Sequence, residues 1–169
     1  MYGQKDKANK AIARLENDIE LVTNNFRYKN KKIVILHATA RGVTVELDGS
    51  IAGCVAKKLK LNNIASDDLP LNKKSYKIPF SLEVLLVRNP DIIFVTIMGD
   101  IDKIKAKFIS NIQNNPAWNS LEAVKKGRII FLPKDLFLIN PGIRYPEALK
   151  YMADEINKIE EKNSLSYKE

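Results

Sequence analysis

The chain has 169 residues, a length typical of one domain, and its 45% hydrophobic and 28% charged residues are ordinary for a globular protein. Its single cysteine, Cys54, excludes an internal disulfide framework and a cysteine metal cluster, and its single histidine, His37, argues against a multi-histidine zinc site. The formal net charge of +8, from 28 basic and 20 acidic residues, raises the question of a nucleic-acid partner.

The lysines that give this charge are spread along the sequence. They occur in the separate segments 29–32, 57–60, 73–77 and 103–107, with acidic residues between them, and the arginines are not clustered. A base-reading or stacking surface needs a basic stripe with interleaved aromatic residues. We therefore expect solvated lysines and no nucleic-acid partner. No apolar run approaches the roughly 20 residues of a membrane span, and the first residues lack the hydrophobic segment of a signal peptide.

The first part of the chain predicts a helix, two strands and a second helix. Residues 6–26 carry one apolar stripe at alternating spacings of four and three, which is typical of an amphipathic helix. The continuous apolar run 32–37 predicts a buried parallel strand, and the alternating run 43–47 predicts a strand with one solvent face. Ser50 then caps a helix through Leu59, which places Cys54 on the apolar face as a small core residue rather than a nucleophile.

The second part alternates strands with helices. Residues 61–75 are polar and irregular, and Ser81 caps a helix that ends at Asn89-Pro90. Strong strands are predicted at 91–97 and 128–132, with an amphipathic helix over 101–112 between them. A final helix begins near Pro146, and residues 161–169 form a frayed tail.

This order predicts an α/β fold: a three-layer, Rossmann-like lobe with a central, mainly parallel sheet and helices on both faces. We expect the strands to point the same way. Ligands of such sheets bind beyond the carboxyl ends of the strands, so the loops 38–42, 98–100 and 134–144 are the ones to inspect. No glycine-rich phosphate loop follows Leu36 or Ile97. That absence counts against a cytoplasmic flavodoxin-like or nucleotide-binding domain, which remains the alternative function.

A few residues could carry chemistry, and each also has a structural explanation. His37 could contact a ligand or act as a general base, but no carboxylate or serine partner lies at motif spacing, so we favour a hydrogen-bonded histidine at a strand end. Arg41 and Arg144 could bind anionic oxygens or form surface salt bridges. Glu83 in the first turn of its helix favours the positive helix end. Trp118 is expected to pack a loop against the core rather than stack on a ligand.

Several segments together resemble the carboxy-terminal lobe of extracytoplasmic substrate-binding proteins of ATP-binding-cassette importers, in the group that serves ferric siderophores, haem and cobalamin. No single segment is decisive, but their order and spacing are specific and cover most of residues 32–158. The segments are 61–65 (LNNIA), 81–86 (SLEVLL), 89–93 (NPDII), 116–121 (PAWNSL), 123–133 (AVKKGRIIFLP) and 140–144 (NPGIR).

The resemblance implies a binding protein rather than an enzyme, with no catalytic residue, no resident metal and no cofactor. Its ligand would be an iron complex held between two lobes, and its partner an importer permease. Residues 1–26 would be the end of the interlobe linker and the first helix, and 27–160 the carboxy-terminal lobe. We expect the amino-terminal lobe, and the secretion or lipoprotein signal of a periplasmic or lipid-anchored protein, to lie outside this chain.

The resemblance also implies roles for six residues. Those expected to line the ligand cleft are His37, Thr39, Arg41, Phe137 and Arg144, and Glu83 matches a glutamate that faces the permease. The chain departs from the family pattern at two places. Lys60 stands where a glycine often precedes the asparagine motif, and residues 43–47 lack a clear glycine-rich loop.

Overall fold

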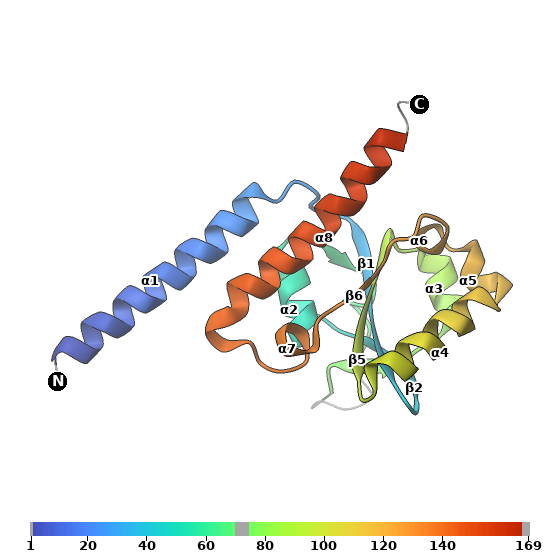
Figure 1. Ribbon diagram of the computed structural model, residues 1–169, viewed down its shortest axis with the longest axis horizontal. Coiled ribbons are helices and arrows are strands. Elements are labelled where there is room, and N and C mark those ends of the chain that lie inside the picture. Colours follow the sequence, from blue (N-terminus) through green and yellow to red (C-terminus); the bar gives the residue numbers. More distant parts are fainter. Residues whose placement is uncertain (1, 70–74, 167–169) are drawn as a thin grey trace.

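The computed structural model describes residues 2–69 and 75–166, which form a six-stranded sheet between two layers of helices (Figure 1). The strands are β1 (Lys32–Thr39), β2 (Gly42–Glu46), β3 (Asn62–Asn63), β4 (Lys77–Pro79), β5 (Ile92–Met98) and β6 (Ile129–Phe131). The helices are α1 (Tyr2–Asn25), α2 (Ile51–Lys58), α3 (Leu82–Arg88), α4 (Ile101–Gln113), α5 (Pro116–Ser120), α6 (Glu122–Lys125), α7 (Lys134–Phe137), the 3-10 turn η1 (Gly142–Arg144) and α8 (Tyr145–Ser166).

The sheet has a parallel centre and an antiparallel edge. Its order is β4-β2-β1-β5-β6, with β3 also paired to β1, and β1, β3, β5 and β6 run parallel. The mainly parallel sheet is confirmed, but the expectation that all strands point the same way is wrong for β2 and β4, which pair antiparallel. The reason is chain length: only Ala40 and Arg41 separate β1 from β2, whereas a parallel return needs a crossover of a dozen residues or more.

Two apolar cores lie on opposite faces of the sheet, as the alternation of side chains along β1 requires. Ile33 and Ile35 pack with α2, α7 and α8 on one face. Val34 and Leu36 pack on the other face, which α3 to α6 cover. Trp118 belongs to this second core and is buried, with Phe80 stacked on it at a ring distance of 5.5 Å. The packing role expected for Trp118 is confirmed.

Helix α2 begins and ends as its sequence indicates. The Ser50 side chain accepts a hydrogen bond from Gly53 N at its start. At its end, Lys60 N donates to Lys57 O and Leu61 N donates to Ala56 O, with Lys60 in the left-handed conformation at φ 58°. These two bonds define a Schellman motif, whose left-handed position usually holds glycine. The glycine expected from the family pattern therefore has a backbone reason, and Lys60 occupies that strained position.

Cys54 is exposed, so the prediction that it lies in the core is wrong. The buried face of α2 consists of Ala52, Gly53, Val55 and Ala56. These four positions direct Cys54 away from the sheet, where its thiol lies 3.3 Å from Asp48 O. The apolar character of cysteine alone does not show which side of the helix is buried against the sheet.

Helices α1 and α8 run alongside each other in Figure 1, and the amino-terminal part of α1 extends away from the sheet. Ile19 and Val22 pack against the core, whereas Ile12 is 54% exposed. Helix α8 continues to Ser166, beyond the expected start of the frayed tail, because nothing after Pro146 stops the helix. Residues 167–169 lie outside the described part of the chain.

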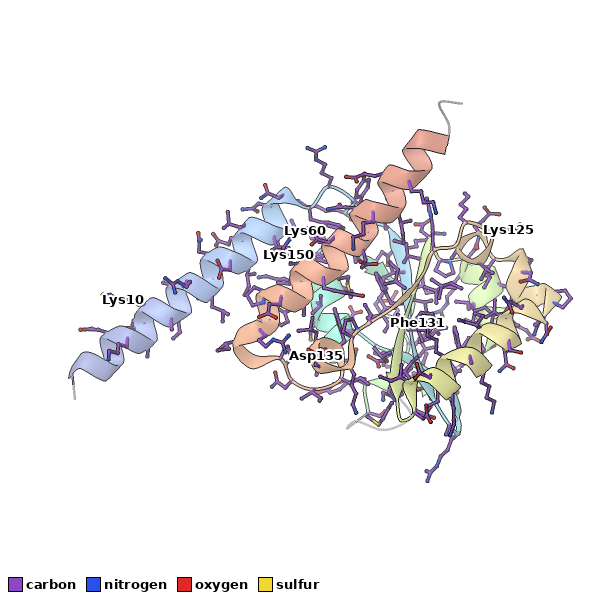
Figure 2. All side chains as sticks on the ribbon, in the orientation of Figure 1. Lys10, Lys60, Lys125, Phe131, Asp135 and Lys150 are labelled. Carbon is purple, nitrogen blue, oxygen red and sulfur yellow. The ribbon has the colours of Figure 1, made fainter. Side chains whose placement is uncertain are left out.

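Among the described residues, no helix is both long and apolar enough to span a bilayer. The basic residues are dispersed, as expected: Lys10 lies on α1, Lys125 on α6 and Lys150 on α8, at separate places on the molecule (Figure 2). Many basic side chains are paired with nearby acids, as Lys125 is with Glu122 and Lys150 with Asp154.

Candidate ligand-binding site

The loops expected to meet a ligand gather at one edge of the sheet. The parallel strands β1 and β5 end level with each other, with Thr39 opposite Met98, and β6 ends beside them at Phe131. The β1–β2 turn, the β5–α4 connection and the α7–α8 segment all follow these ends. Because carboxyl ends of parallel strands form the ligand edge of such sheets, this edge is the candidate site.

A hollow of about 330 Å³ lies at this edge, on the face covered by α2 and α7. Met98, Phe137 and Leu138 supply its apolar wall, and Glu46 and Lys77 supply opposite charges. The mixture of apolar surface with a few polar groups is typical of small-molecule sites. The remaining lining residues are Ser50, Ile51, Ser75 and Tyr76.

Glu46 is the centre of a buried polar cluster next to the hollow. Its side chain is 2% exposed, and its Oε1 lies 2.8 Å from Thr96 Oγ1 and 3.3 Å from His37 Nδ1. Burial alone would raise the pKa of Glu46, but hydrogen bonds from His37, Thr96 and Ser50 outweigh burial, so the pKa is lowered from its ordinary value. The carboxylate is therefore ionised and held in one orientation.

The backbone around Glu46 is fixed by Asn63, the second asparagine of the LNNIA segment. Asn63 Nδ2 donates to Glu46 O at 3.2 Å and to Asp48 Oδ1 at 3.1 Å, and Asn63 Oδ1 accepts from Ala65 N. The side chain is 3% exposed, so these bonds satisfy it in the interior. The asparagine motif thus ties β3 to the end of β2 and holds the cluster in place.

The structure places His37, Thr39 and Arg41 along β1 and its turn, but it gives them different surroundings. His37 is 4% exposed and faces Glu46 and Thr96, so it is a hydrogen-bonded histidine near a strand end, as the sequence predicts. The Thr39 hydroxyl donates to Gly42 O and accepts from Arg41 N, which closes the turn. Arg41 is exposed at the turn, and its guanidinium forms no ion pair within the described chain.

Arg144 and Phe137 lie at the same edge, from the segment after β6. Arg144 Nε lies 2.9 Å from Glu147 Oε2 and Nη1 lies 3.1 Å from Asp135 Oδ2. Hydrogen bonds to these two carboxylates raise the pKa of the Arg144 guanidinium, and the bond to Glu147 has the larger effect. An anionic ligand would have to compete with both carboxylates for Arg144. Asp135 comes from α7 (Figure 2). The ring of Phe137 is 1% exposed and packs edge-on against Tyr151, so it forms the wall of the hollow from within the core.

Glu83 lies away from this edge, on the exposed side of α3. The helix begins at Ser81, whose hydroxyl accepts from Val84 N at 3.3 Å, and Glu83 is in its first turn. Beside α3 a second hollow of about 290 Å³ is lined by Ile78, Phe80 and Val84, with Arg88 at its rim. This hollow contacts the opposite core and is separate from the candidate site.

Glu46 and Thr96 were not predicted as partners of His37. Thr96 lies 59 residues after His37 and reaches it through the parallel pairing of β1 with β5. Glu46 reaches it because β2 turns back directly after Arg41. The interval between the apolar run 32–37 and the alternating run 43–47 is only five residues and contains Gly42, and this is the signal that could have indicated the hairpin. Within the described residues, no group of three or more His, Cys, Asp or Glu side chains is placed to hold a metal ion.

Comparison with known proteins agrees with this architecture and identifies a family for the chain. The sequence pattern of the family described as periplasmic binding protein matches residues 1–136. The iron-uptake system-binding protein of Bacillus subtilis is 27% identical over 137 residues, which are 76% of this chain and 40% of that protein. The chain therefore spans well under two thirds of this relative.

Solved structures show the same fold. An ABC transporter substrate-binding protein from Listeria monocytogenes is 26% identical with a TM-score of 0.74, over 89% of this chain and 57% of that one. IsdE from Staphylococcus aureus, solved with heme, is 24% identical with a TM-score of 0.74, over 91% of this chain and 58% of that one. The family match over most of the residues, together with this fold, shows that the chain belongs to the periplasmic binding protein family.

Proposed function

We propose that this chain is the carboxy-terminal half of an extracytoplasmic substrate-binding protein that captures an iron complex and delivers it to an importer permease. The observation that carries the proposal is the family match over residues 1–136, combined with a sheet edge that holds a hollow and the exposed Arg41, which forms no ion pair within the described chain. Relatives named for iron uptake and heme binding favour an iron complex over other cargo.

The sheet edge suits an anionic chelate with apolar parts. Arg41 supplies an exposed guanidinium, whose planar donors bind carboxylate, catecholate or phosphate oxygens. Met98 and Phe137 supply apolar wall, and Arg144 adds a second guanidinium once the ligand displaces Glu147 or Asp135. His37 and Thr39 precede Arg41 on β1, with Arg41 N donating to the Thr39 hydroxyl, and we propose that they shape this part of the cleft. The alternative, a cytoplasmic flavodoxin-like or nucleotide-binding domain, is not favoured, because the family is one of transport proteins.

Binding by this chain alone should be weak, because affinity comes from contacts with both lobes at once. The test measures Trp118 fluorescence during titration with haemin, a ferric catecholate, a ferric hydroxamate and cobalamin. We expect weak saturable binding of at least one iron complex, reduced by Arg41→Ala and unchanged by the matched substitution Arg14→Ala on the remote helix α1. Equal binding by both variants would contradict the proposed cleft, and the absence of binding by every iron complex would contradict the proposed cargo.

Glu83 is the residue we propose for docking to the permease. It is exposed on α3, away from the ligand edge, and it forms no ion pair among the described residues. In a two-lobed protein that carries this lobe, Glu83→Ala should leave ligand affinity unchanged and reduce uptake. Glu122→Ala, which removes a half-buried glutamate on α6, is the control. Uptake that is equal in the two variants would remove the docking role.

A further inference from the structure

The ring of Tyr76 lines the hollow of the candidate site and is held in place from two sides. The residue is 57% exposed, and its carbonyl oxygen accepts a hydrogen bond from Leu47 N at 2.8 Å. The ring lies against Gly49, where a Cβ atom would overlap Tyr76 Cδ1 and come within 2.5 Å of Cε1. An aromatic side chain that is fixed before a ligand arrives has little conformational entropy left to lose on binding.

Lys77, the next residue, gives the hollow a positive charge that no described residue neutralises. It lies directly opposite Glu46 in the pairing of β4 with β2, and both residues line the hollow. The two form no ion pair, because the Glu46 carboxylate is bonded to Thr96 and lies beside His37. Glu46 is 2% exposed, whereas Lys77 is half-buried, so a ligand in the hollow meets the ammonium group and not the carboxylate. An ammonium group in this position suits an anionic oxygen.

The rest of the wall is apolar and suits a flat ring. Met98, at the end of β5, is 50% exposed, and Phe137 and Leu138 continue the apolar surface. Thioether sulfur atoms and tyrosine rings both make favourable contacts with aromatic rings. The volume of about 330 Å³ is at the lower end of the range of about 300–1,000 Å³ for small-molecule pockets. The hollow therefore takes one ring of a larger ligand.

We propose that Tyr76 and Lys77 form a cargo subsite for one aryl arm of an iron chelate, an aromatic ring that carries an oxyanion, as a catecholate does. This inference rests on the proposed function. The aryl ring packs against Tyr76 and Met98, and its oxygen accepts a hydrogen bond from Lys77. Gly49 is a positioning residue, because only a residue without a Cβ atom leaves room for the Tyr76 ring. An anionic chelate without an aromatic ring can use Lys77 but gains nothing from Tyr76.

The test compares two anionic iron complexes, ferric tris(catecholate) and ferric citrate, of which only the first has aromatic rings. Equilibrium dialysis with radiolabelled iron measures the binding of each complex to the chain. Tyr76→Ala should weaken binding of the catecholate complex about fivefold to tenfold and leave ferric citrate unchanged, whereas Tyr76→Phe should retain most of the affinity. Gly49→Ala should act like Tyr76→Ala. Lys77→Gln should weaken both complexes, and Lys57→Gln, at the far end of α2, is its matched control.

The outcomes separate the subsite from the proposed function. An equal effect of Tyr76→Ala on both complexes, or no effect on either, would overturn ring packing at Tyr76. Catecholate binding that is the same in the Lys77→Gln and Lys57→Gln variants would overturn the contact with the oxyanion. Binding of ferric citrate but not of the catecholate complex would overturn the subsite as a whole. In each of these cases an iron complex still binds and the proposed function stands, whereas a chain that binds neither complex refutes both.

Discussion

Glu46 Oε1 and His37 Nδ1 lie 3.3 Å apart on two strands joined by a two-residue turn, in a place where both side chains are almost fully buried. Because the pKa of Glu46 is lowered in the folded protein, folding favours the ionised carboxylate. The resulting stability is present above the pKa of Glu46 in the unfolded chain and is lost as the pH falls through the lower, folded-state value.

The first prediction follows from the lowered pKa of Glu46. The free energy of unfolding should decrease as the pH falls through the acidic range below the ordinary glutamate pKa, and Glu46→Gln should weaken this dependence. At neutral pH the same substitution should cost about 1–3 kcal/mol, because hydrogen bonds to a buried charged group are lost. Urea denaturation across the acidic range measures both effects. Glu147→Gln, at an exposed glutamate, is the control, and an equal pH dependence in the two variants would contradict the assignment.

The second prediction concerns the left-handed residue after α2. Lys60 has φ 58°, a conformation that costs a residue with a Cβ atom about 1 kcal/mol relative to glycine. Lys60→Gly should therefore raise the free energy of unfolding by about that amount, less the entropy that glycine adds to the unfolded chain. Thermal denaturation measures the change. Lys58→Gly, inside the same helix, should instead lower the melting temperature, and a stabilising effect there would contradict the argument.

Much of the fold could be predicted because local rules and the tertiary structure agree. Ser50 and Ser81 cap the helices they were expected to cap, and Ile92 to Met98 form the buried strand between β1 and β6. Asn89 ends α3 in a left-handed conformation immediately before Pro90, where a helix end was expected. In each case, the residues that decide the structure lie within a few positions of one another.

The wrong and missing predictions concern features that are determined by contacts between residues far apart in the sequence. Cys54 is apolar in character, but the side of α2 that is buried depends on how the helix meets the sheet. His37 meets Glu46 because β2 runs antiparallel to β1, and it meets Thr96 because β5 pairs with β1. The residues next to His37 in the sequence do not determine either pairing. The resemblance placed Phe137 and Arg144 at the ligand edge, yet it gave no indication that Asp135 and Glu147 already bind Arg144.

The third prediction concerns the ion pair that links α3 to the segment after β3. Arg88 donates to both carboxylate oxygens of Asp68, at 2.6 and 2.8 Å, and also to Ile64 O. The hydrogen bond from Arg88 lowers the pKa of Asp68. Because both side chains are partly exposed, Asp68→Asn should cost no more than about 1 kcal/mol. The cost should shrink in concentrated salt, as urea denaturation at two salt concentrations can show, and a cost that is independent of salt would contradict an ionic origin.

The last prediction concerns the contact between α2 and the end of β2. Gly53 is buried, and a Cβ atom there would meet the Leu47 carbonyl oxygen and lie 2.7 Å from Asp48 Cα. These are backbone atoms that cannot rotate away, so Gly53→Ala should destabilise the protein by about 1–3 kcal/mol, despite the higher helix propensity of alanine. Relief of this contact would displace Leu47, and Glu46 would move as well because it is the preceding residue. Cys54→Ala, one position along and exposed, should change stability little. Denaturant unfolding of the two variants compares them directly, and a Gly53→Ala protein as stable as Cys54→Ala would show that α2 does not approach β2 this closely.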